Sequence, residues 1–232
     1  MGKLKNPVAI IQARMGSTRL PGKVLMPIGD KSMLQRVIER VKRAKKVKEV
    51  VVALPLREHD KPIVDLCMML KVRCFCGSEP DVLDRYYRAA KMFEADPIVR
   101  ITSDCPLVDP EVIDNCIECY EQTAHGEWVA AIVPDGLDVE VVSFRSLEEA
   151  AKKATLPYDR EHVMPWIKGF YLGTMPIMSP AIIHWSVDTA EDLEFVRYVY
   201  MKLGNRFHYQ DIFKLLKREA IWRSRLSPAK GS

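Results

Sequence analysis

The amino-acid sequence predicts an α/β fold in which a mixed but mainly parallel β-sheet is sandwiched between helices. Two observations lead to this prediction. Apolar, β-branched runs alternate with amphipathic segments along the first half of the chain, and four of these runs are almost continuously apolar. Continuous apolar strands are typical of parallel sheets buried on both faces, and helices between them are typical of parallel crossover connections.

The first half of the chain alternates between predicted strands and predicted helices. Each strand is inferred from a short run of aliphatic residues, and each helix from apolar residues at helical spacing. We expect strands over residues 7–13, 49–54, 72–75 and 97–102, and helices over residues 32–46, 59–70, 81–93 and 111–122. Pro110 stands at the expected first turn of the last helix, where proline is tolerated. Residues 14–31 contain glycines and prolines, so we expect a loop there.

The second half of the chain is less regular. We expect strands over residues 128–133, 137–144 and 170–177, a strand-like run over 185–188, and helices over 146–154, 160–168, 189–203 and 210–220. Thr189 is followed three residues later by Asp192, which is typical of a capped helix N-terminus. Because the sequence has no internal repeat and no low-complexity linker, we expect one domain over residues 1–232.

The composition of this chain of 232 residues and 26.6 kDa is that of an ordinary globular protein. Hydrophobic residues make up 48% and charged residues 28%, which excludes a disordered or collagen-like chain. The longest uncharged apolar stretches are far shorter than the roughly 18 residues of a transmembrane helix, and no signal peptide is recognisable. We therefore expect a cytoplasmic protein without membrane insertion. Six cysteines are too few for a disulfide scaffold, and no histidine has the spacing of a zinc site.

The net charge of +4 is unevenly distributed. Residues 1–48 contain 13 Lys and Arg but only two acidic residues, so this segment carries +11 and the remainder −7. Such a basic segment suggests an anionic ligand, either a nucleotide or a nucleic acid. We interpret its cations from Arg36 to Lys48, Arg40 among them, as the solvated face of a helix, because they surround apolar residues at helical spacing. Nucleic-acid binding is disfavoured, since no aromatic stacking platform accompanies them.

The loop over residues 13–23 (ARMGSTRLPGK) is the first candidate for chemistry. Its glycines would let backbone N–H groups approach a phosphate, and its arginines and Lys23 would neutralise the phosphate charge. The loop is not a P-loop, because Ser17 stands in place of the first glycine and Val24 in place of the metal-binding Ser or Thr. By spacing alone, both a phosphate site and an ordinary surface loop remain open.

Two aspartates that follow predicted strands are the second candidate. Asp104 comes just after one strand, and Asp188 ends a strand-like run before a helix. Ligands of open parallel sheets bind beyond the carboxyl ends of the strands, so these loops can lie side by side. Two carboxylates facing a cationic loop would suit Mg²⁺ and phosphoryl or nucleotidyl transfer. Alternatively each aspartate only caps a helix or turn, which we expect for Asp109 before Pro110.

Six motifs, taken in order, carry a resemblance to a known family. They are residues 10–25 (IIQARMGSTRLPGKVL), 75–78 with 81–86 (FCGS, DVLDRY), 100–113 (RITSDCPLVDPEVI), 135–144 (DGLDVEVVSF), 160–163 (REHV) and 185–193 (WSVDTAEDL). The chain thereby resembles the acylneuraminate/3-deoxy-manno-octulosonate cytidylyltransferases, in particular their spore coat polysaccharide biosynthesis branch. The resemblance runs almost the whole length of the chain. It implies a nucleotide-diphospho-sugar transferase fold (GT-A, Rossmann-like) and an enzyme that joins a sugar acid to CTP, releasing pyrophosphate.

The resemblance also assigns roles to residues of these motifs. For the nucleotide it implies Ala13 and Met15 near the base and ribose, Arg14, Gly16, Ser17 and Lys23 around the triphosphate, and Ser78, Asp81, Arg85 and Thr102 as further contacts. For the metal it implies Asp104 and Asp188. For the acceptor it implies Asp138, Glu140, Arg160, Glu161 and His162, with a structural role left open for Glu161 and His162.

The implied reaction is in-line attack by an acceptor oxygen on the α-phosphate of CTP. Mg²⁺ at Asp104 and Asp188 would be the cofactor, and Arg14 and Lys23 would stabilise the departing pyrophosphate. The resemblance further implies a nucleotide-binding half (1–125), an acceptor-binding half (126–208), a C-terminal helix and tail (209–232), and a homodimer.

One departure and several alternatives accompany this reading. Ser103 stands where the family usually has glycine before the metal-binding aspartate, and its Cβ restricts close approach to a ligand. The alternatives are nucleotidyl transfer from UTP, GTP or ATP, glycosyl transfer on the same fold, and a non-catalytic nucleotide-binding subunit.

Overall fold

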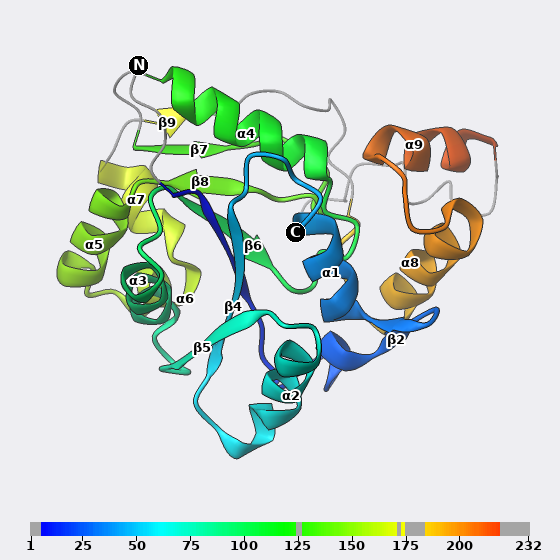
Figure 1. Cartoon of the computed structure of the whole chain (residues 1–232), viewed down its shortest axis with the longest axis horizontal. Coiled ribbons are helices and arrows are strands. Elements are labelled where there is room, and N and C mark those ends of the chain that lie inside the picture. Colours follow the sequence, from blue (N-terminus) through cyan, green and yellow to red (C-terminus); the bar gives the residue numbers. More distant parts are fainter. Residues whose placement is uncertain (1–5, 124–126, 171–172, 175–183, 219–232) are drawn as a thin grey trace.

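A computed structural model describes residues 6–123, 127–170, 173–174 and 184–218 and confirms the predicted α/β class (Figure 1). Its main sheet has seven strands in the order β5-β4-β1-β6-β8-β7-β9. The first four are parallel neighbours: β5 (Arg73–Gly77), β4 (Glu49–Pro55), β1 (Val8–Gln12) and β6 (Ile98–Thr102). β8 (Glu140–Val142) runs antiparallel between β6 and β7 (Trp128–Ala130), and β9 (Gly173–Thr174) runs parallel to β7.

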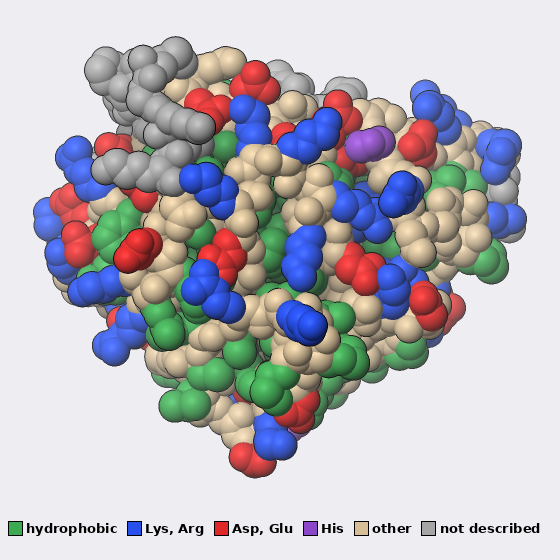
Figure 2. Space-filling view, in the orientation of Figure 1, with side chains coloured by type: hydrophobic (Ala, Val, Ile, Leu, Met, Phe, Trp, Pro, Cys, Tyr) green, Lys and Arg blue, Asp and Glu red, His purple; other side chains and the backbone are tan. Residues whose placement is uncertain are grey.

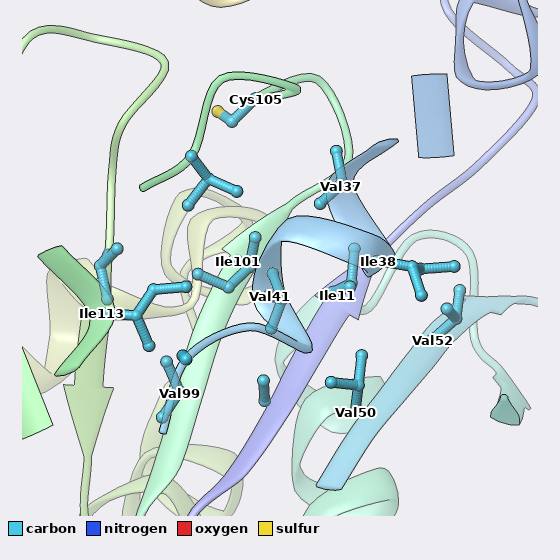
Figure 3. Packing of buried hydrophobic residues seen from close by; sticks show 14 of the residues in the cluster. Ile11, Val37, Ile38, Val41, Val50, Val52, Val99, Ile101, Cys105 and Ile113 are labelled. Atoms are coloured by element: carbon cyan, nitrogen blue, oxygen red, sulfur yellow. The ribbon is translucent and has the colours of Figure 1, made fainter. Parts of the chain in front are cut away.

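Helices cover both faces of this sheet (Figure 1). One face carries α1 (Met33–Val41), α2 (Lys61–Met69) and α4 (Pro110–Gln122), and the other carries α3 (Val82–Met92), α5 (Phe144–Lys153), α6 (Pro157–His162) and α7 (Met164–Phe170). Along β1, Ala9 and Ile11 pack toward α1, whereas Val8 and Ile10 pack toward α3. Side chains alternate between the faces of a strand, so a sheet covered on both faces requires an unbroken apolar run. Figure 3 shows the first of these two layers, where α1 packs against the central strands.

The last two described helices form a third packed cluster beside the sheet. α8 (Ala190–Leu203) and α9 (Tyr209–Arg218) pack with Trp185, Val187 and Leu107. α8 begins with the predicted capping arrangement, in which the Thr189 side chain accepts from the backbone N–H of Asp192 and the Asp192 carboxylate accepts from that of Thr189. This cluster fixes the segment before α8 beside the loop after β6.

Several segments differ from the expectation. Residues 14–31 also contain the 3-10 helix η1 (Lys23–Leu25) and an antiparallel ribbon of β2 (Pro27–Ile28) and β3 (Lys31–Ser32), and η2 (Glu58–Asp60) precedes α2. The strand expected over 185–188 is wrong, because the backbone bridge there is a single one between His184 and Asp135. The single helix expected over 160–168 is also wrong, because α6 and α7 meet at Val163, whose φ of 69° interrupts the helical backbone. Residues 171–172 and 175–177 of one predicted strand and residues 219–220 of one predicted helix lie outside the described residues.

The interpretation of Arg36 and Arg40 as solvated is wrong. They are only 4% and 1% exposed. Arg36 donates to the carbonyl oxygen of Ile28 at 2.7 Å, and Arg40 donates to those of Val108 and Phe207 at 2.6 and 3.1 Å. A guanidinium can be buried where carbonyl oxygens replace its hydration. These arginines therefore fasten α1 to neighbouring loops instead of facing an anionic partner. Over the face shown in Figure 2, basic and acidic side chains are interspersed and form no continuous basic stripe.

Two further expectations concern membranes and cysteines. Across the described residues, none of the helices combines the length and hydrophobicity that crossing a bilayer requires. Cys74 and Cys76 lie on β5 and Cys116 and Cys119 on α4, as expected, and all six cysteines are free thiols.

Candidate active site at the carboxyl ends of the strands

The loops after β1 and β6 and the segment before α8 surround a cleft of about 350 Å³. The cleft lies at the carboxyl ends of the central parallel strands, where open α/β sheets bind ligands. Predicted site residues that line it are Ala13, Arg14, Ser17, Lys23, Arg85, Thr102, Asp104, Glu161, His162 and Asp188. The other lining residues are Gln12, Thr18, Arg19, Val24, Val82, Arg100 and Ser103.

The candidate phosphate loop is held in shape by a buried carboxylate. The backbone N–H of Met15 donates to Oδ1 of Asp60 at 2.7 Å, and Arg57 donates to Oδ2 at 2.8 Å. Asp60 is completely buried. At the far end of the loop, Gly22 has a φ of 70° and its N–H donates to the carbonyl of Met15 at 3.1 Å. Sequence reasoning missed Asp60, because it follows a different strand and no local pattern links it to the loop.

Lys23 lies between the two candidate metal ligands. Its ammonium is 3.2 Å from Oδ2 of Asp104 and 3.2 Å from Oδ1 of Asp188, and it donates to the carbonyl of Val187 at 2.6 Å. Arg19, on the same loop, approaches Asp188 to 2.8 Å. The N–H of Val187 donates to the carbonyl of Asp104 at 2.9 Å and joins the two segments directly. The candidate loop and the two candidate aspartates therefore meet at one point.

The charges around Lys23 favour the ionised form of Asp104. Burial by itself would raise the pKa of Asp104, but the ammonium of Lys23 and a hydrogen bond from Thr102 outweigh it, so that this pKa lies below its ordinary value. Asp104 is thus negatively charged at neutral pH. Two carboxylate oxygens that already converge on one cation are the hard donors that Mg²⁺ prefers, so the residues present fit this metal.

A second group of metal-binding side chain types lies outside the cleft. Asp109, Glu111 and His208 come close to one another, but none of them lines the cleft. The carboxylate of Asp109 accepts from the backbone N–H of Glu111 at 2.9 Å and of Tyr209 at 2.6 Å. As predicted, Asp109 caps α4, and it also fastens the start of α9.

The inner part of the cleft is formed by one face of the sheet and two helices. Gln12, Arg100 and Thr102 line it from β1 and β6, and Val82 and Arg85 line it from α3. α6 contributes Glu161 and His162. Arg85 is buried, which lowers its pKa despite nearby acids, and it donates to the carbonyl of Ser78 at 2.6 Å.

Other predicted site residues are not brought into the cleft. Asp81 caps α3 and forms an ion pair with Arg160 at 2.5 Å, and Arg160 also donates to the carbonyl oxygens of Ala151 and Ala154. This pair fastens α6 to α3. Met15, Gly16, Ser78, Asp138 and Glu140 are also absent from the cleft lining.

Asp138 and the missed residue His184 belong to a neighbouring acidic cluster. Burial, followed by the charges of Asp135 and Glu140, raises the pKa of Asp138 to about 6, although it accepts a hydrogen bond from the N–H of Gly136 at 2.9 Å. His184 lies 2.5 Å from Asp135 through Nδ1 and 3.8 Å from Asp188 through Nε2. A single histidine outside any motif gave no sequence signal.

Comparisons with known proteins agree with this geometry. A family model described as cytidylyltransferase matches residues 8–177. The protein MJ1063 of Methanocaldococcus jannaschii is 40% identical over 207 residues, covering 86% of this chain and 84% of that protein. The spore coat polysaccharide biosynthesis protein SpsF of Bacillus subtilis is 32% identical over 210 residues, covering 85% and 87%.

A solved structure extends the similarity to nearly the whole chain. The cytidylyltransferase from Leptospira borgpetersenii serovar Hardjo-bovis superimposes with a TM-score of 0.89 at 29% identity, covering 98% of this chain and 99% of that one. The family model matches well over half of the chain, so the chain belongs to the cytidylyltransferase family and is a nucleotidyltransferase.

Proposed function

We propose that this protein transfers CMP from CTP to a hydroxyl group of a sugar acid, with Mg²⁺ as cofactor and pyrophosphate as the leaving product. The observation that carries this proposal is the meeting of Lys23 with Asp104 and Asp188 in a cleft that Arg14 also lines. A triphosphate there would meet the cations of the loop, and the two carboxylates would hold its metal. The similarity to SpsF supports a role in polysaccharide or glycan synthesis.

In this proposal the aspartates bind the metal and the basic residues stabilise the phosphates. Asp104 and Asp188 would hold Mg²⁺, which when bound supplies charge neutralisation and lowers the pKa of the acceptor hydroxyl. Lys23 and Arg14 would donate to the phosphates that leave as pyrophosphate and stabilise the charge they develop. No protein nucleophile is needed, because positioning and electrostatics supply most of the catalysis in such transfers.

The inner part of the cleft is left for the base and the acceptor. Thr102 and Arg85 would contact the nucleotide, and Glu161 and His162 on α6 would face the acceptor. α6 is fastened to α3 by the pair Asp81–Arg160, which keeps these two side chains in place without touching a ligand.

Pyrophosphate release with Mg²⁺ tests the proposal. CTP, UTP, GTP and ATP are each combined with nonulosonic acids, octulosonic acids and simpler hydroxy acids. We expect release with CTP and one class of sugar acid. Asp104→Asn should lose nearly all turnover and keep its fold, whereas Asp65→Asn, a matched change at a half-exposed carboxylate on α2, should keep full activity. Full activity of Asp104→Asn at ordinary Mg²⁺ would contradict the metal assignment, and release from UTP in preference to CTP would contradict the nucleotide.

A further inference from the structure

Arg100 is a cation placed in the middle of the central sheet. It lies on β6, opposite Ile10 of β1 on one side and Glu140 of β8 on the other. The residues two positions away on the same face of β6 are Ile98, in the core, and Thr102, at the cleft. Placing a charge among apolar strands costs free energy unless partners compensate it.

Glu140 is the acidic partner of Arg100, but it engages only one nitrogen of the guanidinium. Nη1 of Arg100 lies 2.5 Å from Oε2 of Glu140, and Nη2 lies 3.4 Å from the side-chain oxygen of Gln12. Glu140 is shared with Lys168, whose ammonium is 2.6 Å from Oε1. Burial would raise the pKa of Glu140, but the charges of Arg100 and Lys168 lower it, so this carboxylate is ionised. One carboxylate is thus shared by two cations, and among the described residues it leaves the Nε–H of Arg100 without an acceptor.

Two buried donors at this end lack acceptors. The Nε–H of Arg100 is buried without a hydrogen-bond partner in the described part of the chain, and the same holds for the Nε–H of Arg85, a residue only 2% exposed. The Nη1 of Arg85 donates to a neutral carbonyl, that of Ser78. Both arginines line the cleft, one from the sheet and one from α3. A buried donor left without an acceptor destabilises the protein, and a bound anion that accepted from it would relieve this cost.

We propose that Arg100 binds the carboxylate of the acceptor and so selects acids over neutral sugars. The triphosphate has its own cations on the loop after β1, namely Arg14, Arg19 and Lys23, and the base of a nucleotide is uncharged. The carboxylate is therefore the anion left for Arg100. The planar pair of carboxylate oxygens matches the fork of a guanidinium. Glu140 fixes the orientation of the Arg100 guanidinium through Nη1. This inference rests on the proposed function and names the element that recognises the acceptor.

The test follows the arginine Nε–H groups by NMR in protein labelled with ¹⁵N-arginine. The probes are 3-deoxy-manno-octulosonate and N-acetylneuraminate, each compared with its own carboxamide, which keeps the sugar and removes the charge. Arg100→Lys identifies the Arg100 signal by its loss, and it keeps the positive charge while lacking an Nε–H. Arg73→Lys is the matched control, because Arg73 lies on the edge strand β5, paired with Glu49 and outside the cleft.

We expect one of the acids to shift the Arg100 signal saturably and its carboxamide to leave it unmoved. Arg100→Lys should raise the Kd of that acid about 10- to 100-fold, the usual strength of one hydrogen bond to a charged group, and should leave the stabilisation by CTP unchanged. Arg73→Lys should change neither. If Arg100→Lys does not fold, the proposal is tested by the affinities of the unmodified protein for the acid and for its carboxamide. We expect the acid to bind at least about 10-fold more tightly.

The proposal is overturned if neither acid moves the Arg100 signal, if acid and carboxamide bind equally, or if Arg100→Lys binds the acid as tightly as the unmodified protein. Failure of the proposed function has a different signature, namely no pyrophosphate release and no stabilisation by any nucleotide. The NMR titration needs neither turnover nor nucleotide, so the two failures are distinguishable.

Discussion

Replacing Lys23 by methionine removes the one ammonium that lies between Asp104 and Asp188. At 3.2 Å and an effective dielectric constant of about 20, each contact contributes a Coulomb attraction of roughly 5 kcal/mol before desolvation. Removing one partner of a buried ion pair typically costs about 3–5 kcal/mol. Arg19 remains at 2.8 Å from Asp188, so we place the loss at the lower end, about 3 kcal/mol. For a chain of this size that is a fall in Tm of about 6–12 °C.

The stability lost in Lys23→Met should depend on pH. With Lys23 present, the pKa of Asp104 lies below its ordinary value, so the carboxylate contributes stability above its unfolded-state pKa and loses it as the pH falls. Without Lys23, burial dominates and the pKa of Asp104 rises, so the carboxylate becomes a destabilising charge that protonation relieves. The difference in Tm between the two proteins should therefore be larger at pH 7 than at pH 5.

Thermal melts at pH 5 and 7, with and without Mg²⁺, measure both effects. Mg²⁺ should stabilise Lys23→Met more than the unmodified protein, because the metal then binds carboxylates that no ammonium occupies. The matched control is Lys61→Met, whose exposed partner Asp65 lies at 3.6 Å, and it should change stability by less than about 1 kcal/mol. A Lys23→Met loss that is independent of pH, or an equal response of both proteins to Mg²⁺, would refute the reasoning.

Two further predictions concern the frame of the cleft. Gly136→Ala should destabilise the protein by more than about 2 kcal/mol and reduce turnover, because Gly136 has a φ of 99° and an added Cβ would lie 2.4 Å from the backbone of Trp185. Gly169→Ala is its control, because a Cβ there would meet no atom within 4 Å in the described part of the chain beyond its own helix backbone and chain neighbours. Equal melting temperatures of the two variants would contradict the argument. Asp60→Ala removes the acceptor of the Met15 N–H and should raise the KM for CTP at least about 10-fold, as steady-state kinetics would show. An unchanged KM would mean that the loop holds its shape without this carboxylate.

Local sequence pattern determined the layout of the sheet. The runs of β1, β4 and β6 are almost continuously apolar because both faces of these strands are covered, and this requirement is visible in the chain itself. The meeting of Lys23 with Asp104 could also be anticipated, because the loops after the neighbouring parallel strands β1 and β6 emerge at one edge. Asp188 reaches the same point from a segment that is not a strand, which the fold and not the pattern decided. Their roles as phosphate and metal ligands stay predictions.

Other features depended on pairings that no local pattern contains. The sequence suggested a solvated face for Arg36 and Arg40, and the fold instead placed carbonyl oxygens of distant loops against them. The family resemblance implied ligand contacts for Asp81 and Arg160, and it did not reveal that the fold pairs these two side chains with each other. An ionisable side chain can satisfy its charge with any group the fold brings near, so its partner cannot be read from its own neighbours in sequence.

The sequence by itself therefore determined the fold class, the edge of the sheet at which the cleft lies and the residue types that gather there. The tertiary structure alone decided which buried side chains become partners. Arg100 meets Glu140 because β8 enters the sheet antiparallel beside β6, and Asp60 reaches Met15 because η2 lies beneath the loop after β1. Hydrophobic periodicity is a property of one segment, whereas electrostatic compensation is a property of pairs that only the folded chain forms.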